Sequence, residues 1–171
     1  MPVKGGKGGA NTNKTGLAFE RKTSLEEALL AADFDVQGFK VYQTDELRAE
    51  LAPKHQFYKF LESKDVNWRP LISKRLLPDD ALFSISGNRM NIIEKKWQET
   101  SGSVDEKLQT VGFKIRQYNK LLEPAGIELK FIYLLNDWFA KPEYDDVRDY
   151  ILESGGSYHF MKVPLDELEL G

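Results

Sequence analysis

The sequence predicts an α/β protein in which helices cover both faces of one mixed β-sheet. Apolar residues recur with helical or strand spacing in the order helix, strand, hairpin, helix, strand, helix, strand. Residues 127–135 (IELKFIYLL) end in the continuous apolar run FIYLL, which is typical of a strand buried on both faces. Because such a strand needs a helical layer on each side, we expect three layers with the sheet in the middle.

The composition predicts one globular, cytoplasmic domain. The 171 residues are 41 % hydrophobic and 12 % aromatic, which is enough for one core and leaves little room for a second. No apolar run approaches the roughly 18 residues of a membrane span, and residues 1–14 lack the apolar segment of a secretory signal. There is no cysteine, which excludes disulfides, thiol catalysis and thiolate metal sites. The net charge of −3 gives no general attraction to a polyanion.

Residues 1–13 are predicted to form a flexible basic arm that precedes a single domain at residues 14–171. The arm is rich in Gly, Lys and Asn, which are residues of loops and mobile segments. A first helix is expected to begin near Thr15. Ser24 and Glu27 then form a capping box, so a second helix should begin there.

The remaining short elements follow from the same signals. Residues 39–44 (FKVYQT) predict a strand, and residues 55–64 (HQFYKFLESK) predict a short helix or a loop. Towards the C-terminus, residues 144–154 (YDDVRDYILES) predict a helix and residues 157–163 (SYHFMKV) predict a final strand.

A longer helix is predicted before the apolar strand. Ser103 and Glu106 form a second capping box at its start. Five apolar residues then share one helical face: Leu108, Val111, Ile115, Tyr118 and Leu122. Lys107, Lys114 and Gln117 share a polar face, which we expect to be solvated as most such faces are.

The segment PDDALFSISGNRMNIIEKKW, residues 78–97, predicts a β-hairpin with charges at its open end. Gly87-Asn88 is a favoured pair for a two-residue hairpin loop. Side chains alternate between the faces of a strand. One face would therefore carry eight residues: Asp79, Ala81, Phe83, Ile85, Met90, Ile92, Glu94 and Lys96. In this register Asp79 lies opposite Lys96 and diagonal to Glu94.

The same register separates the two adjacent aspartates. Asp79 belongs to the face that carries Glu94 and Lys96, whereas Asp80 is expected to pair with Lys95 at the surface. A different turn length would reverse this assignment.

Three charges at the end of an otherwise apolar face favour a metal site. Burying unpaired charges there would be costly for a purely structural element. Two converging carboxylates, Asp79 and Glu94, form an oxygen-rich site for a hard divalent cation such as Mg²⁺. With Lys96 beside them, they could place a water in line with a phosphate. The lysine could orient the water, deprotonate it or neutralise the oxyanion. The alternative is a salt-bridged strand edge without a ligand.

These hairpin residues resemble the signature of the PD-(D/E)XK nuclease superfamily. Pro78-Asp79 and Glu94-Lys95-Lys96 match an aspartate and an acid-x-lysine that lie, in that family, on adjacent strands of a mixed sheet flanked by helices. The doubled acid Asp79-Asp80 departs from the pattern and leaves open which aspartate is the ligand.

The resemblance extends to both sides of the hairpin and covers about residues 11–136. Residues 11–20 (NTNKTGLAFE) are similar to the start of the first helix in the restriction-endonuclease branch, where a glutamate approaches the metal; Glu20 is the matching residue. Residues 94–110 (EKKWQETSGSVDEKLQT) resemble the segment that joins the catalytic strand to the next helix, and Gln98 matches a polar position after the lysine.

The resemblance implies a restriction endonuclease-like three-layer fold and Mg²⁺-dependent cleavage of DNA. The implied member is a type II restriction endonuclease that acts as a homodimer on double-stranded DNA. Its catalytic residues would be Asp79, Glu94, Lys96, Glu20 and Gln98, and Asp79, Glu94 and Glu20 would hold Mg²⁺. The alternatives are a structure-specific nuclease similar to a junction resolvase, and a DNA-binding module without catalysis.

Five residues are candidates for contacts with DNA: Asn13, Lys14, Arg75, Ser103 and Lys107. Asn13 and Lys14 could follow the DNA backbone from the N-terminal arm, or the arm could be a disordered end without a ligand. Arg75 precedes the hairpin and could contact a phosphate. Ser103 could present helix N–H groups to a phosphate, although such a serine is more often only a cap.

Overall fold

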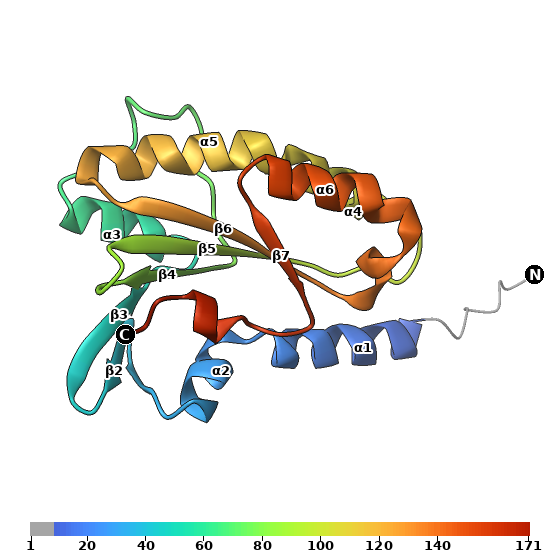
Figure 1. Cartoon of the computed structure of the whole chain (residues 1–171), viewed down its shortest axis with the longest axis horizontal. Helices are drawn as coiled ribbons and strands as arrows, with labels where there is room; N and C mark the ends of the chain where they lie inside the picture. The colour runs from blue at the N-terminus through green and yellow to red at the C-terminus, as the bar shows by residue number, and fades with distance from the viewer. Residues whose placement is uncertain (1–8) are drawn as a thin grey trace, which may run out of the picture.

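In a computed structural model, the chain folds around one seven-stranded mixed sheet whose strands lie in chain order, β1 to β7 (Figure 1). The structure describes residues 9–171, with side chains from residue 16 onward. β1 to β5 pair antiparallel, whereas β6 is parallel to β5 and β7 is parallel to β6. The predicted mixed sheet is therefore confirmed.

The elements of the described chain have the following bounds. The strands are β1 (Asp35–Gln37), β2 (Lys40–Gln43), β3 (Glu46–Leu51), β4 (Asp80–Ser84), β5 (Arg89–Lys96), β6 (Glu128–Leu135) and β7 (Ser157–Phe160). The α-helices are α1 (Gly9–Lys22), α2 (Leu25–Ala31), α3 (Gln56–Ser63), α4 (Val104–Lys107), α5 (Val111–Leu122) and α6 (Asp145–Glu153).

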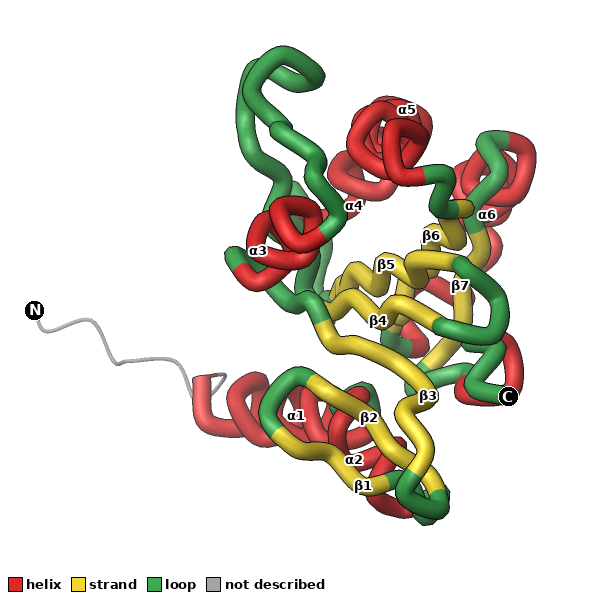
Figure 2. The backbone as a smooth tube through the Cα atoms, turned by 90° about the vertical axis from the view of Figure 1, so that its left-hand side faces the viewer, coloured by secondary structure: helices red, strands yellow, loops and turns green. Residues whose placement is uncertain are grey.

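Helices cover both faces of the sheet and give the three predicted layers. On one face, Phe57 of α3 and Tyr118 of α5 pack with Ile92 of β5 in the larger core cluster. On the other face, Leu29 of α2 packs with Ile93 of β5 in a second cluster, which also includes the C-terminal segment. Figure 2 shows α3, α5 and α6 on one side of the sheet and α1 and α2 on the other.

The N-terminal elements differ in part from the prediction. α1 begins at Gly9 rather than near Thr15, so residues 9–13 of the predicted arm are helical, and residues 1–8 lie outside the described chain. α2 begins as predicted, because the Ser24 hydroxyl accepts the N–H of Glu27 at 3.3 Å. Among the described residues, none of the helices is long and apolar enough to span a membrane.

The predicted long helix is divided into α4, a short 3₁₀ turn at Leu108–Thr110, and α5. Its apolar stripe is correct, since Leu108, Val111, Tyr118 and Leu122 are buried. The second capping box is wrong: in the described chain the Ser103 side chain makes no capping hydrogen bond, and the residue has helical backbone angles instead of the extended ones that a cap favours.

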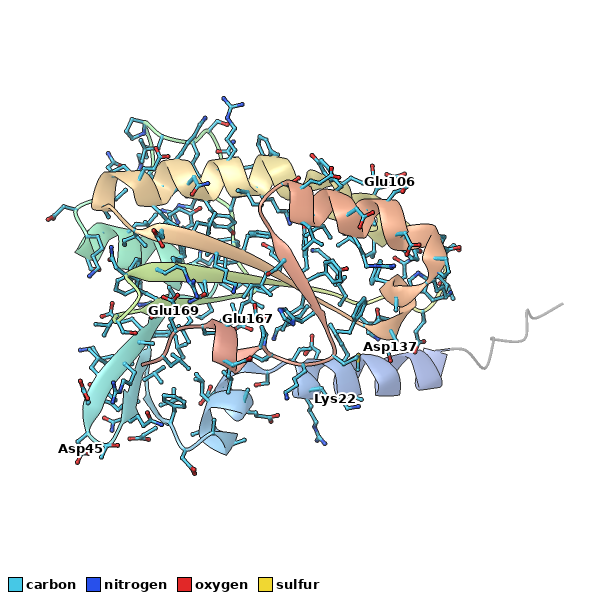
Figure 3. All side chains as sticks on the ribbon, viewed as in Figure 1. Lys22, Asp45, Glu106, Asp137, Glu167 and Glu169 are labelled. Carbon is cyan, nitrogen blue, oxygen red and sulfur yellow. The ribbon has the colours of Figure 1, made fainter. Side chains whose placement is uncertain are left out.

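The hairpin loop spans residues 85–88, because Ser84 pairs with Arg89, so the predicted two-residue loop is wrong. Ile85, predicted on the apolar face, lies in this loop and is 42 % exposed. The loop is longer than predicted because the C-terminal segment contacts it. Glu169 of this segment is labelled in Figure 3. The Ser84 hydroxyl accepts the N–H of Gly87 at 3.1 Å and donates to the carbonyl of Glu169, which draws these residues away from the ladder.

The change of register leaves the predicted faces intact. Moving a strand pairing by two residues returns every side chain to its original face, whereas a shift of one would reverse them. The four apolar residues predicted to share a face do lie together in the larger core cluster: Ala81, Phe83, Met90 and Ile92. The shift does change the residue opposite Asp79. The last pair of the ladder at this end is Asp80 with Ile93, so one further pair in the same register sets Asp79 opposite Glu94 instead of Lys96.

Candidate active site

The candidate site lies at the end of the β4–β5 pair, where its first carboxylate is held by the backbone of β5. Asp79 immediately precedes β4, and its Oδ2 accepts the N–H of Lys95 at 2.8 Å. Residues directly opposite in an antiparallel pair have Cβ atoms about 5 Å apart. The strand register, continued by one pair beyond Asp80–Ile93, therefore makes Asp79 and Glu94 neighbours at the level of their Cβ atoms.

Glu94 supplies the second carboxylate from within the core. It is 6 % exposed and lies beside Tyr133 of β6 in the parallel register. Its Oε2 accepts a hydrogen bond from Lys114 Nζ at 3.1 Å, and Lys96 Nζ lies 3.7 Å from the same oxygen. Burying a charged carboxylate is costly unless neighbouring groups offset its charge. Here the two ammonium groups offset the charge of Glu94.

Asp79 is paired with a lysine from another part of the chain. Lys54 Nζ lies 2.6 Å from Asp79 Oδ1. Burial raises the pKa of the Asp79 carboxyl, but the hydrogen bonds from Lys54 and from the Lys95 N–H, together with the charge of Lys96, outweigh this effect. The net pKa of Asp79 lies below its usual value, so the carboxylate is ionised at neutral pH.

Asp80 faces away from this site, as predicted. Its Oδ2 lies 2.9 Å from Lys95 Nζ, which confirms the predicted pair, although both side chains are largely buried. Burial raises the pKa of Asp80, and the charge of Lys95 opposes the rise. Asp79, and not Asp80, therefore shares a face of the hairpin with Glu94 and Lys96.

Lys96 has the properties of a group that can exchange a proton. Burial lowers the pKa of its ammonium, and the positive charges of Lys114 and Lys107 lower it further. Glu94 and Asp79 oppose these effects only in part. A lysine with a lowered pKa is nearer to its neutral form at working pH and can act as a base or orient a water.

Gln98 follows Lys96 and is held in place through its backbone. Its N–H donates to Asn136 Oδ1 at 3.1 Å, and its carbonyl accepts from Asn136 Nδ2 at 2.7 Å. The residue is 5 % exposed, and both side-chain polar atoms lack a hydrogen-bond partner among the described residues. A buried amide without a partner costs about 1–3 kcal/mol, which favours a role in binding a ligand.

The hydroxyl of Tyr118 is a second buried polar group of this kind. Tyr118 is fully buried on α5, and its hydroxyl has no partner within the described part of the chain. Burial raises the pKa of this hydroxyl well above its usual value, and the charge of nearby Glu94 raises it further. Tyr118 therefore stays neutral and presents a donor in the neighbourhood of Glu94.

Glu20 is exposed on α1. Among the residues whose side chains are described, no group of three or more His, Cys, Asp or Glu is arranged to hold a metal ion. The carboxylates that the hairpin brings together are Asp79 and Glu94, and a role for Glu20 stays a prediction.

The candidate DNA contacts lie on different elements of the chain. Lys107 is exposed, and its positive charge contributes to the lowered pKa of Lys96. Ser103 is exposed at the start of α4. The Arg75 guanidinium stacks over two rings, with its carbon 4.7 Å from the Tyr58 centroid and 5.0 Å from the Trp68 centroid. Asn13 and Lys14 belong to α1, but their side chains lie outside the described part. All five contacts stay predictions.

Two lysines of the site, Lys54 and Lys114, were not predicted. Lys114 was assigned to a solvated face, and this is wrong because its ammonium is bound to Glu94. The sequence carried a signal: Lys114 is three residues after Val111 and four before Tyr118, so it shares their buried face. Lys54 carries no such signal, because it reaches Asp79 only through the fold.

A comparison with protein families gives a match over residues 13–121 to the PD-(D/E)XK nuclease superfamily domain. The matched region exceeds half of the chain and contains Asp79, Glu94 and Lys96. The chain therefore belongs to this superfamily, which indicates a nuclease with a restriction endonuclease-like fold. Comparisons with curated proteins and with solved structures gave no match.

Proposed function

We propose that this member of the PD-(D/E)XK nuclease superfamily is a Mg²⁺-dependent type II restriction endonuclease, which hydrolyses phosphodiester bonds of double-stranded DNA at a specific sequence. One observation carries the proposal: the β4–β5 register, continued by one pair beyond Asp80–Ile93, sets Asp79 opposite Glu94, and Lys96 Nζ lies 3.7 Å from Glu94 Oε2. The family match over this segment supports the same reaction class.

Asp79 and Glu94 would hold the metal ion. Their carboxylate oxygens are the ligands that Mg²⁺ prefers. The pair also fits a cation because each carboxylate already has an ammonium nitrogen close to it, at 2.6 Å for Asp79 and 3.1 Å for Glu94. Glu20 is proposed as a further ligand on the resemblance alone. When bound, the ion would supply positive charge to the phosphate and make a bound water more acidic.

Lys96 and Gln98 would act on the attacking water. The lowered pKa of Lys96 lets the amine accept a proton as the water oxygen bonds to phosphorus, while the bond from phosphorus to the leaving oxygen breaks. The Gln98 amide, held by Asn136 and with its polar atoms unpartnered in the described chain, would orient the same water or a phosphate oxygen. Lys107 would neutralise charge on the DNA backbone.

A homodimer is part of the proposal. Each chain supplies one set of Asp79, Glu94 and Lys96, whereas cleavage of a duplex breaks two strands. A dimer with two-fold symmetry would present one site to each strand.

The experiment is to incubate the protein with long duplex DNA and Mg²⁺, with EDTA and Glu94→Gln as controls. Discrete fragments that disappear in both controls are expected. Cleavage only of branched DNA, tested in parallel, would favour the structure-specific nuclease. Binding of DNA without cleavage of any substrate, with the same behaviour in Glu94→Gln, would contradict the proposed enzyme.

A further inference from the structure

Asp79 and Glu94 each have a lysine partner that lies outside the acid-x-lysine motif. Lys54 Nζ is 2.6 Å from Asp79 Oδ1, and Lys114 Nζ is 3.1 Å from Glu94 Oε2. Lys96 adds a third ammonium, 3.7 Å from Glu94. Lys54 and Lys114 therefore already match the two carboxylates, and Lys96 in its charged form gives the cluster an excess of positive charge before any metal ion binds.

Lys54 is positioned for this contact by its backbone. Its φ of 49° lies in the left-handed region, which lysine rarely adopts, and its N–H donates to the carbonyl of Pro78 at 2.9 Å. The backbone of Lys54 is thereby tied to the residue before Asp79. Its side chain is 55 % exposed, so the ammonium can leave the carboxylate for solvent or for an incoming anion without disturbing the core.

Lys114 reaches Glu94 from α5. It projects from α5 within the buried face that also holds Val111 and Tyr118, and its side chain is 19 % exposed. The two lysines thus come from different elements and engage different carboxylates. This arrangement exceeds what neutralisation of Asp79 and Glu94 requires, because Lys96 is already within reach of Glu94.

We infer that Lys54 and Lys114 are exchangeable counter-cations of the metal site. They hold Asp79 and Glu94 while the ion is absent, compete with a divalent ion for the same oxygens, and pass to phosphate oxygens of DNA when the ion takes their place. A divalent ion alone would add to an existing excess of positive charge, whereas DNA supplies the missing negative charge. Metal and DNA should therefore bind with positive coupling, and this inference rests on the proposed function.

The first test measures Mn²⁺ binding to the protein without DNA by calorimetry. Lys54→Met and Lys114→Met should each bind Mn²⁺ tighter than the wild type, by roughly fivefold or more, which is the lower range of coupling between sites. Lys54→Arg keeps the charge and should bind like the wild type. Lys59→Met is the matched control, because Lys59 is an exposed lysine of α3, and it should also leave the affinity unchanged.

The second test adds linearised plasmid DNA, in a Lys96→Met background to prevent cleavage. DNA should strengthen Mn²⁺ binding in this background, and adding Lys54→Met or Lys114→Met should reduce that strengthening by a similar factor. Circular dichroism establishes that each variant is folded.

The outcomes separate this inference from the proposed function. If the wild type binds Mn²⁺ and Asp79→Asn abolishes the binding, but the lysine variants bind with equal or weaker affinity, the exchange of cations is wrong and the metal site stands. If Mn²⁺ does not bind to the wild type with or without DNA, the proposed function fails together with the inference.

Discussion

The two ends of the β4–β5 pair are both charged, yet they are completed in different ways. At the loop end, the C-terminal segment binds Arg89. Its Nη1 lies 2.9 Å from Glu169 Oε1, and its guanidinium also donates to the carbonyl of Glu167. Lys130 and His159 then hold the Glu167 carboxylate, at 2.9 and 3.2 Å. Figure 3 shows Glu167 and Glu169 on the segment that crosses this region.

The open end has the opposite balance. Three lysines surround Asp79 and Glu94, and the amide of Gln98 lacks a partner in the described chain. At the loop end a segment of the protein itself supplies acids and carbonyls to the cations. Charge at a strand end therefore does not by itself mark a site. A site is marked where the surrounding groups leave an excess of charge that a ligand can balance.

Substitution of Asp79 should lower the rate of DNA cleavage far more than substitution of the adjacent Asp80. Asp79→Asn should lower the single-turnover rate of DNA cleavage by about 10²–10³-fold, because it removes a charge aimed at the reacting centre. Asp80→Asn should keep the rate within a few-fold of the wild type, since Asp80 pairs with Lys95 on the other face. An equal loss in both variants would contradict the assignment of Asp79 alone to the site.

Arg89→Met should remove the contacts between the loop end and the C-terminal segment, and it should leave the contacts of the open end unchanged. The free energy of unfolding, measured with denaturant, should fall by about 1–2 kcal/mol, because Glu169 and the carbonyl of Glu167 lose a charged donor. The rate of DNA cleavage per folded molecule should not change. A large loss of rate in a folded Arg89→Met protein would mean that the two ends are not separate in function.

Arg75→Met tests whether the surroundings of the open end bind DNA. The affinity for DNA should fall uniformly across sequences, and the slope of its salt dependence should decrease by about 1, as expected for one phosphate contact. Arg116→Met, which changes an exposed arginine of α5, is the control. Equal salt slopes for Arg75→Met and the wild type would leave Arg75 with only its stacking on Tyr58 and Trp68.

The smallest expected effect is a pH dependence at the loop end. The hydrogen bond from Lys130 lowers the pKa of Glu167 below 4.5; burial opposes this, and His159 adds to it. The unfolded chain therefore binds the proton at a higher pH than the folded one, and the stabilisation is present at neutral pH and lost as the pH falls through the lowered value. The difference in unfolding free energy between wild type and Glu167→Gln should shrink at acidic pH. A difference independent of pH would contradict this.

The sequence predicted the faces of the hairpin better than its loop. Alternation assigned Asp79, Glu94 and Lys96 to one face, and this assignment tolerates a shift of two residues. The loop could not be predicted because Glu169, far away in the chain, holds Ser84. The strands β1 and β3 were also missed. β1 has only three residues, and three of the six residues of β3 are charged (Glu46, Arg48 and Glu50), so neither shows an apolar run.

At the site too, contacts that depend on distant parts of the chain could not be predicted from the sequence. Lys96 could be identified because it lies within the hairpin, and Gln98 because the family resemblance includes a polar position after the lysine. Lys54 could not, because its contact with Asp79 depends on the path of the chain between β3 and α3. Lys114 could have been found, since a lysine within a buried helical face needs an acidic partner.

The most direct test of the central claim is Lys96→Met, measured for both cleavage rate and unfolding. The claim is that the open end serves chemistry at the expense of stability. Burial disfavours the charge of Lys96, so an apolar replacement should leave the unfolding midpoint unchanged or raise it. The cleavage rate should fall by about 10²–10³-fold. A variant that is destabilised as much as Arg89→Met and still cuts DNA at the wild-type rate would contradict the account.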